Sequence, residues 1–148
     1  MSKSTSKAHW SGSLIEGSGT VTTASSALHE RELTWRARTG EAAGTTPEEL
    51  IAAAWAGCYS MAFSGAAAKA GHTPRSVDVE ASISFGPTSD GGFEIRSGEL
   101  VVSADVPGIE DDTFQELARG AKDGCPVSVA LGRISADAKL EARLTTSA

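Results

Sequence analysis

Two cysteines carry the main chemical potential of this chain. Cys58 lies in an alanine-rich apolar run that begins at Thr46, and Cys125 lies between Gly124 and Pro126. A cysteine reacts as the thiolate, and an oxidised cysteine beside a second thiol can form a disulfide. In a reducing compartment, two cysteines are more often catalytic or metal-binding than a permanent bridge. A two-cysteine redox site is therefore the leading hypothesis.

A reactive Cys58 requires a nearby cation, because burial in an apolar helix raises the pKa of a thiol above about 8.5. Arg36 and Arg38 precede the apolar run and are the candidates. Arginine stays protonated and offers a planar fork to a thiolate and a peroxide oxygen together. Glu48 could hold that guanidinium through a bidentate contact. Such a set would need no cofactor.

Each of these residues also has a purely structural interpretation. An inert, buried helix cysteine is about as common an outcome as a reactive one for Cys58 alone. Glu48 and Glu49 taken alone are typical first-turn acids that interact favourably with the helix dipole. A zinc site made from the cysteines and a histidine lacks a close ligand pair, so no metal is expected. The tryptophans are expected in the core: Trp10, Trp35 and Trp55.

The bulk properties exclude several classes of protein. The 148 residues fit one domain, 1–148, with residues 1–7 as a polar tail. A net charge of −6 without a basic cluster argues against nucleic acid. The tail lacks the apolar core of a signal peptide, and no segment reads as a membrane span. We therefore expect a cytoplasmic protein that binds neither nucleic acid nor a membrane.

The sequence predicts an alternation of strands and helices, and these elements must position the cysteines, the arginines and Glu48. Thr46 and Glu49 form a capping box around Pro47, which predicts a helix from Pro47 to residue 69 or 70, stopped by Gly71. A shorter helix is predicted to run to about residue 122, with Asp111 or Asp112 as its N-cap and Gly124 as its stop, and another is predicted over residues 126–131. Strands are predicted over residues 9–15, 19–24, 31–38, 77–85, 93–106 and 133–144. This order indicates an α+β fold with a mostly antiparallel sheet.

The long helix is expected to need cover from a second subunit. A helix over residues 47–70 is about 35 Å long, whereas a chain of this size has a radius of gyration of roughly 15 Å. The helix is also apolar on most of its faces. A helix that is hydrophobic nearly all round must be buried nearly all round.

Four segments resemble the OsmC/Ohr family, and the likeness covers nearly the whole chain. They are residues 8–12, 44–62, 106–109 and 121–128. The loop from Arg38 to Gly44 and the Pro-Gly-Ile segment resemble the osmotically inducible OsmC branch more than the Ohr branch. The resemblance implies an OsmC-like fold, with antiparallel sheets wrapped around long central helices in an intertwined homodimer.

The resemblance also implies a thiol-dependent peroxidase for organic and fatty-acid hydroperoxides, and less efficiently for hydrogen peroxide. By position, Cys58 matches the thiolate that becomes a sulfenic acid, and Cys125 matches the thiol that resolves it into a disulfide. Glu48 and Arg38 match the family's acid and arginine, with Arg36 as the alternative arginine. The expected reductant is a dithiol such as dihydrolipoamide, presented by a lipoylated protein.

Glu48 and Cys58 are expected to cooperate across the dimer. Ten helical residues separate them, which corresponds to about 15 Å along a straight helix. A partner subunit could bring Glu48 alongside the other Cys58.

The alternative is a non-catalytic osmotic-stress or apolar small-molecule-binding protein with structural or redox-sensing thiols. A general thiol–disulfide oxidoreductase is a weaker option, because the sequence has no Cys-x-x-Cys motif. Saturable hydroperoxide turnover with a dithiol would separate these functions.

Overall fold

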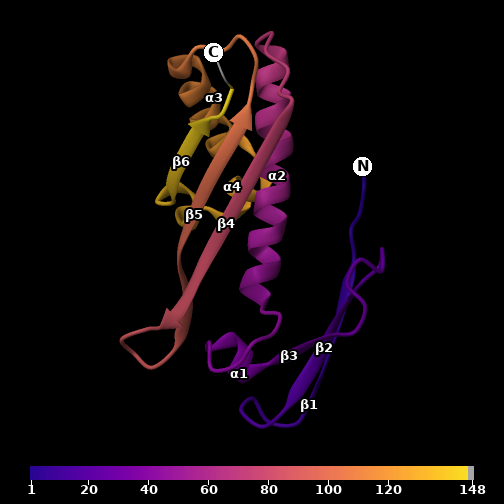
Figure 1. The fold of residues 1–148 in the computed structure, drawn as a ribbon. Coiled ribbons are helices and arrows are strands. Elements are labelled where there is room, and N and C mark those ends of the chain that lie inside the picture. The colour runs from indigo at the N-terminus through magenta and orange to yellow at the C-terminus, as the bar shows by residue number, and fades with distance from the viewer. Residues whose placement is uncertain (147–148) are drawn as a thin grey trace. The chain divides into compact units, whose positions relative to one another are not determined.

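The chain folds into two compact units, residues 1–50 and the part from Ile51 onward. The structure, a computed structural model, describes residues 1–146. Six strands form two three-stranded sheets, and one long helix, α2 (Pro47–Lys69), begins in the first unit and continues in the second (Figure 1). The predicted α+β class, with sheets and a long helix, is confirmed.

The first unit is a three-stranded antiparallel sheet followed by a short helix. Its strands are β1 (Ser6–Ser11), β2 (Ser18–Thr23) and β3 (Arg31–Thr34), in the order β1-β2-β3. β1 begins and ends earlier than the predicted strand 9–15, so it includes the last two residues of the expected polar tail. Residues after Ser11 turn instead, since the Gly17 amide donates to the Ser13 carbonyl at 2.9 Å.

The predicted strand over residues 31–38 is wrong in its second half. Thr34 is extended, and its hydroxyl accepts a hydrogen bond from the Ala37 amide at 3.1 Å. A threonine in this position is an N-cap, so the chain turns into α1 (Trp35–Arg38). Arg36 and Arg38 therefore lie on a helical turn and not on one face of a strand.

Both ends of α2 are confirmed and are fixed by local hydrogen bonds. The Thr46 hydroxyl accepts from the Glu49 amide at 3.0 Å. At the other end, Gly71 has a φ of +90°, and the amides of Gly71 and His72 donate to the carbonyls of Ala68 and Ala67. This is a Schellman motif, in which a left-handed glycine ends the helix.

The sheet of the second unit contains one parallel pair. β4 (Ser76–Pro87) and β5 (Phe93–Asp105) form an antiparallel hairpin, with a register shift between Ser84 and Phe85. β6 (Lys139–Leu144) pairs in parallel with β5. The sheets are thus mostly, but not wholly, antiparallel.

The predicted strand over residues 133–144 is helical in its first third. α5 (Arg133–Ala136) occupies its first part, after Gly132 with a φ of +55°. The ammonium group of Lys122 donates to the carbonyls of Ser135, Ala136 and Ala138 at 3.2, 3.4 and 3.5 Å. A cation at these terminal carbonyls stabilises the short helix, and the alternating pattern alone does not contain this contact.

Two more helices complete the second unit. α3 (Asp111–Gly124) runs two residues past its predicted end, and its N-cap is Glu110, not Asp111 or Asp112. α4 (Pro126–Leu131) has the predicted bounds.

The core of the second unit forms along one stripe of α2. Trp55, Tyr59, Phe63 and Ala67, spaced four residues apart, are fully buried with β5 side chains that include Leu100 and Val102. The ring of Phe63 meets that of Phe114 on α3 edge to face, with centroids 5.4 Å apart. Trp55 is therefore core, as predicted.

Other faces of α2 are not covered within this chain, and one of the tryptophans expected in the core is exposed. Met61 on α2 is 72% exposed within the chain, and Trp10 is 39% exposed. Trp35 is half-buried. A second subunit that covers α2 stays a prediction.

α2 also has the length and composition of a membrane span, with a mean hydropathy of 1.3. The sequence alone predicts no membrane span, so this property of α2 differs from the expectation. Core helices of soluble proteins share these properties, and the buried stripe of α2 packs on its own unit. Hydropathy therefore gives weak evidence for a membrane here.

Candidate active site

Arg38 and Glu48 form a bidentate pair in the first unit. Arg38 is the last residue of α1, and Glu48 lies in the first turn of α2. The Arg38 Nη2 atom lies 2.8 Å from Glu48 Oε1, and Nε lies 3.2 and 3.3 Å from Oε1 and Oε2. The Glu48 side chain is only 6% exposed, whereas that of Arg38 is 35% exposed. The carboxylate thus holds the guanidinium in one orientation.

A glycine in the connecting loop allows this pairing. A Cβ atom at Gly44 would lie 3.0 Å from the Cβ of Ala37 on α1. This is closer than almost all contacts between such atoms, so a side chain here would push the loop away from α1. The loop then returns to Thr46, which starts α2 and places Glu48.

An apolar cavity of about 420 Å³ lies beside the Arg38 guanidinium. A molecule with an apolar body and a polar or anionic end would match this arrangement. Its lining comes from the first unit and consists of Trp10, Gly12, Leu14, Leu33, Thr34, Trp35, Arg38 and Pro47.

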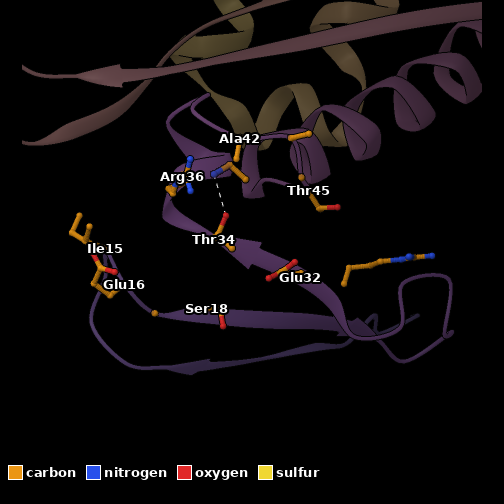
Figure 2. A pocket seen from close by; sticks show the side chains of 13 residues that line it. Ile15, Glu16, Ser18, Glu32, Thr34, Arg36, Ala42 and Thr45 are labelled. Carbon is orange, nitrogen blue, oxygen red and sulfur yellow. Dashed lines mark hydrogen bonds between the residues drawn. The ribbon is translucent and has the colours of Figure 1, made fainter.

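Arg36 lines a different cavity, of about 560 Å³ (Figure 2). Its charged lining residues have both signs, since Arg31 and Arg36 share it with Glu16 and Glu32. Figure 2 shows Arg36 next to Thr34, on the wall that α1 and β3 provide. The two candidate arginines therefore line separate cavities, and it is Arg38 that contacts Glu48.

In the second unit Cys58 packs against the core cluster that contains Cys125, and both cysteines are free thiols. Cys58 is half-buried on α2, and Cys125 is fully buried between α3 and α4. Burial raises the pKa of Cys58 above its ordinary value of 9.0, and the hydrogen bond and charge of Cys125 add to this rise. A hydrogen bond from the Val127 backbone acts in the opposite direction. A reactive Cys58 thiolate therefore needs a cation in addition to these neighbours.

Ser128 contacts the second thiol, and the sequence analysis did not identify it as a site residue. The Ser128 amide donates to Cys125 Sγ at 3.3 Å, and the Cys125 thiol donates to Ser128 Oγ at 3.0 Å. Cys125 is thus the N-cap of α4, with Pro126 in the first helical turn. The available signal was the spacing of Cys125 and Ser128 around this proline, which is that of a capping residue and its N3 partner.

The four residues predicted for the site thus form two pairs, one in each compact unit. Arg38 and Glu48 form a salt bridge, and Cys58 packs against the core cluster that contains Cys125. Over residues 1–146, no three His, Cys, Asp or Glu side chains are grouped so that they could hold a metal ion.

The described chain thus combines an α+β fold with two free thiols, one of them on a long helix, and an arginine–glutamate ion pair. The chain belongs to the OsmC-like protein family, which it matches over residues 39–141. It is 43% identical to peroxiredoxin OsmC of Escherichia coli (strain K12) over 125 residues, which is 84% of this chain and 87% of that protein.

Two further similarities concern the organic hydroperoxide resistance protein OhrB of Bacillus subtilis. The chain is 35% identical to OhrB over 99 residues, which is 66% of this chain and 69% of OhrB. The crystal structure of OhrB has a TM-score of 0.68 with this fold, at 26% identity, and the comparison covers 95% of this chain and 98% of OhrB.

Proposed function

We propose that this protein is a thiol-dependent peroxidase that reduces organic hydroperoxides to alcohols, and hydrogen peroxide less efficiently. The observation that carries the proposal is that the half-buried thiol of Cys58 packs against the core cluster that contains the fully buried Cys125. The names of the relatives, a peroxiredoxin and an organic hydroperoxide resistance protein, support the same chemistry.

The reaction has three steps in this proposal. The Cys58 thiolate attacks the distal oxygen of the hydroperoxide, the O–O bond breaks, and the alcohol leaves after it takes up a proton. Cys58 is then a sulfenic acid. The Cys125 thiolate attacks the Cys58 sulfur, which forms a disulfide and releases water. A dithiol such as dihydrolipoamide, presented by a lipoylated protein, reduces the disulfide and completes the cycle.

Arg38 and Glu48 serve the first step. A guanidinium beside Cys58 would stabilise the thiolate and polarise the O–O bond, and Glu48 would fix its orientation. The cavity of about 420 Å³ beside Arg38 is lined by tryptophan, leucine and proline side chains. These features support a bulky, apolar hydroperoxide, such as that of a fatty acid, as the substrate.

The working unit in this proposal is a homodimer with sites that combine residues of both subunits. Glu48 and Cys58 stand ten residues apart on α2, or about 15 Å along a helix. The exposed Met61 shows that α2 has an apolar face that a second subunit could cover. We infer that the Arg38–Glu48 pair of one subunit acts on Cys58 of the other.

Mixed dimers test this arrangement. When Glu48→Ala and Cys58→Ser chains are combined, each heterodimer should retain about one working site. Folded heterodimers without activity would contradict a shared site and would assign all four residues of each site to one chain.

The two compact units together are proposed to form one OsmC-like domain, because the family match spans the boundary between them. A cytoplasmic location, and the lack of nucleic-acid and membrane partners, remain proposals. The net charge of −6 supports the absence of nucleic acid.

The first experiment is a titration of free thiols in the reduced protein, before and after one equivalent of cumene hydroperoxide. We expect both thiols to disappear, the intact mass to fall by about 2 Da, and dihydrolipoamide to restore both. Cys58→Ser should consume no peroxide, and Cys125→Ser should consume one equivalent only. Two thiols that stay free after long exposure would overturn the peroxidase and leave the alternative, an apolar small-molecule-binding protein.

A further inference from the structure

A buried chain of hydrogen bonds connects Trp55 to Cys125 through Ser128. The indole Nε1 of Trp55 donates to Ser128 Oγ at 2.8 Å, and the Cys125 thiol donates to the same oxygen at 3.0 Å. Trp55 and Cys125 are fully buried, and Ser128 is 3% exposed. Trp55 lies on α2, whereas Cys125 and Ser128 lie at the start of α4. The tertiary fold, and not the local sequence, therefore brings the indole close to the serine.

The indole fixes the direction of this chain. An indole nitrogen can only donate, so Ser128 Oγ must accept from Trp55. The hydroxyl hydrogen of Ser128 is then directed away from the indole and can rotate. A thiolate can only accept, so ionisation of Cys125 reverses its bond with Ser128 Oγ. The sulfur then receives two hydrogen bonds from one residue, one from the Ser128 hydroxyl and one from its amide at 3.3 Å.

We propose that Ser128 and Trp55 are positioning residues that stabilise the Cys125 thiolate and thereby accelerate formation of the Cys58–Cys125 disulfide. Water cannot supply this stabilisation, because Cys125 is fully buried. Hydrogen bonds to the charged form of an acid favour that form. The role in a peroxidase cycle rests on the proposed function, whereas the effect on the reactivity of Cys125 does not.

The step in question balances without a further reactant. The thiolate of Cys125 attacks the sulfur of the Cys58 sulfenic acid, an S–S bond forms, and the S–O bond breaks. The leaving hydroxide takes up the proton that Cys125 gave up, and water results. Ser128 exchanges no proton in this step; it donates hydrogen bonds to the attacking sulfur.

Two other titratable groups face Cys125 from α2, namely Cys58 and Tyr59. The Tyr59 hydroxyl donates to the Ala118 carbonyl at 3.0 Å, and burial raises its pKa so far that it stays neutral. Cys58 is already oxidised when Cys125 attacks, so it carries no thiolate charge at that stage. The Ser128 contacts are therefore the polar interactions that distinguish the thiolate of Cys125 from its thiol in this step.

A glycine on β5 holds the indole in place. A Cβ atom at Gly98 would lie 2.7 and 3.0 Å from the Cζ3 and Cη2 atoms of Trp55. Such distances mean that the indole rests directly on the backbone of the strand. This close packing leaves the Trp55 ring little freedom to turn its N–H away from Ser128.

A chromogenic aryl disulfide, dithiobis(nitrobenzoic acid), tests the proposal without peroxide. One equivalent should react first with the more accessible Cys58 and release one thionitrobenzoate. Cys125 should then attack the Cys58 sulfur of the mixed disulfide and release a second thionitrobenzoate. The rate of this second release, followed from about pH 6 to about pH 9, reports the reactivity of Cys125. The Cys58→Ser protein should release no thionitrobenzoate quickly, and this result would show that Cys58 reacts before Cys125.

Ser128→Ala should slow the second release by about tenfold at neutral pH, since one hydrogen bond to a charged group is lost. The difference from the wild type should shrink as the pH rises, because the thiolate then forms without help. Ser128→Thr should restore most of the rate. Ser135→Ala, the removal of another buried serine, should leave the rate unchanged.

Trp55→Phe removes the N–H and should slow the second release by less than Ser128→Ala. Because Trp55 acts through Ser128, the double variant should be no slower than Ser128→Ala alone. An unchanged second release in Ser128→Ala would overturn the proposal. A slowing by the same factor at every pH, without rescue by threonine, would also overturn it, since that result indicates displaced groups and not a lost thiolate partner.

A parallel experiment with cumene hydroperoxide separates this inference from the proposed function. Sulfenic acid formation at Cys58 should be unchanged in Ser128→Ala, and only disulfide formation should slow. A wild-type protein that ignores the hydroperoxide but shows the expected pH-dependent second release would contradict the peroxidase while leaving the role of Ser128 intact.

Discussion

Nη2 of Arg38 lies 2.8 Å from Oε1 of Glu48, in a pair whose carboxylate is nearly buried and whose guanidinium is about one-third exposed. A buried carboxylate without a partner would be strongly unfavourable, and Arg38 supplies the opposite charge that Glu48 needs. In return, Glu48 fixes the guanidinium on the wall of the apolar cavity. The ion pair distinguishes Arg38 from its neighbour Arg36, which lines a different cavity.

Arg38→Ala should slow the oxidation of Cys58 by hydroperoxide by roughly ten- to a hundredfold, because the cation of the proposed site is lost. The matched control is Arg36→Ala, which removes an arginine from the same helical turn. Stopped-flow measurement of sulfenic acid formation at neutral pH checks both variants. A normal rate in Arg38→Ala with a slow rate in Arg36→Ala would transfer the role to Arg36.

Glu48→Gln should slow the same step by less than Arg38→Ala does, because the guanidinium keeps its charge and loses only part of its orientation. Glu49→Gln is the control, since Glu49 is the adjacent acid in the same first turn and is exposed. The KM for the hydroperoxide and kcat, measured separately, show whether Glu48 affects binding or chemistry. If both variants slowed Cys58 oxidation equally, Glu48 would act only as one of two acids that interact with the helix dipole.

The pKa of Cys58 should lie above 9.0 in Arg38→Ala protein, because burial and then Cys125 raise it. Little thiolate is then present at neutral pH, and alkylation by iodoacetamide should accelerate as the pH rises into the alkaline range. The folded form then holds this proton more tightly than the unfolded chain does. The resulting stabilisation is present below the unfolded pKa and disappears as the pH rises through the folded pKa. A plateau of the alkylation rate below pH 8 would contradict the expected direction.

Gly98→Ala should destabilise the protein by about 1–3 kcal/mol, because the new methyl group would overlap the Trp55 ring. The displaced indole should also change the tryptophan fluorescence and slow the attack of Cys125. Gly120→Ala is the control, since a Cβ at this helical glycine meets nothing within 4 Å. Urea unfolding should show that this control is neutral or slightly more stable. Equal stabilities of the two variants would mean that β5 shifts to make room for the new methyl group, so that the Trp55 ring is not strained.

Lys122→Met should destabilise the protein by about 1–3 kcal/mol, because the carbonyls of Ser135, Ala136 and Ala138 lose their common donor. The Lys122 side chain is only 12% exposed, so methionine keeps most of its apolar packing. Lys139→Met removes an exposed ion pair with Glu99 and should cost less than about 1 kcal/mol. The free energy of urea unfolding decides between them, and a larger effect of Lys139 would contradict the role of Lys122.

The sequence by itself determined the features that depend on neighbouring residues. Thr46 and Gly71 define α2, because caps act within one helical turn. Pro126 starts α4 for the same local reason. The motifs around both cysteines were sufficient for the family, which the match over residues 39–141 confirms.

Only the tertiary structure decided the features that join distant residues. Residues 133–144 alternate like a strand, yet Lys122, 13 residues before Ser135, donates to the carbonyls of a short helix there. Arg36 and Arg38 are equivalent in the sequence, and the Glu48 contact distinguishes them. Trp55 and Ser128 are 73 residues apart, so no local pattern predicts their hydrogen bond. The physical reason is that periodicity and caps record interactions within a turn, whereas the partner of a buried polar group depends on how complete elements pack.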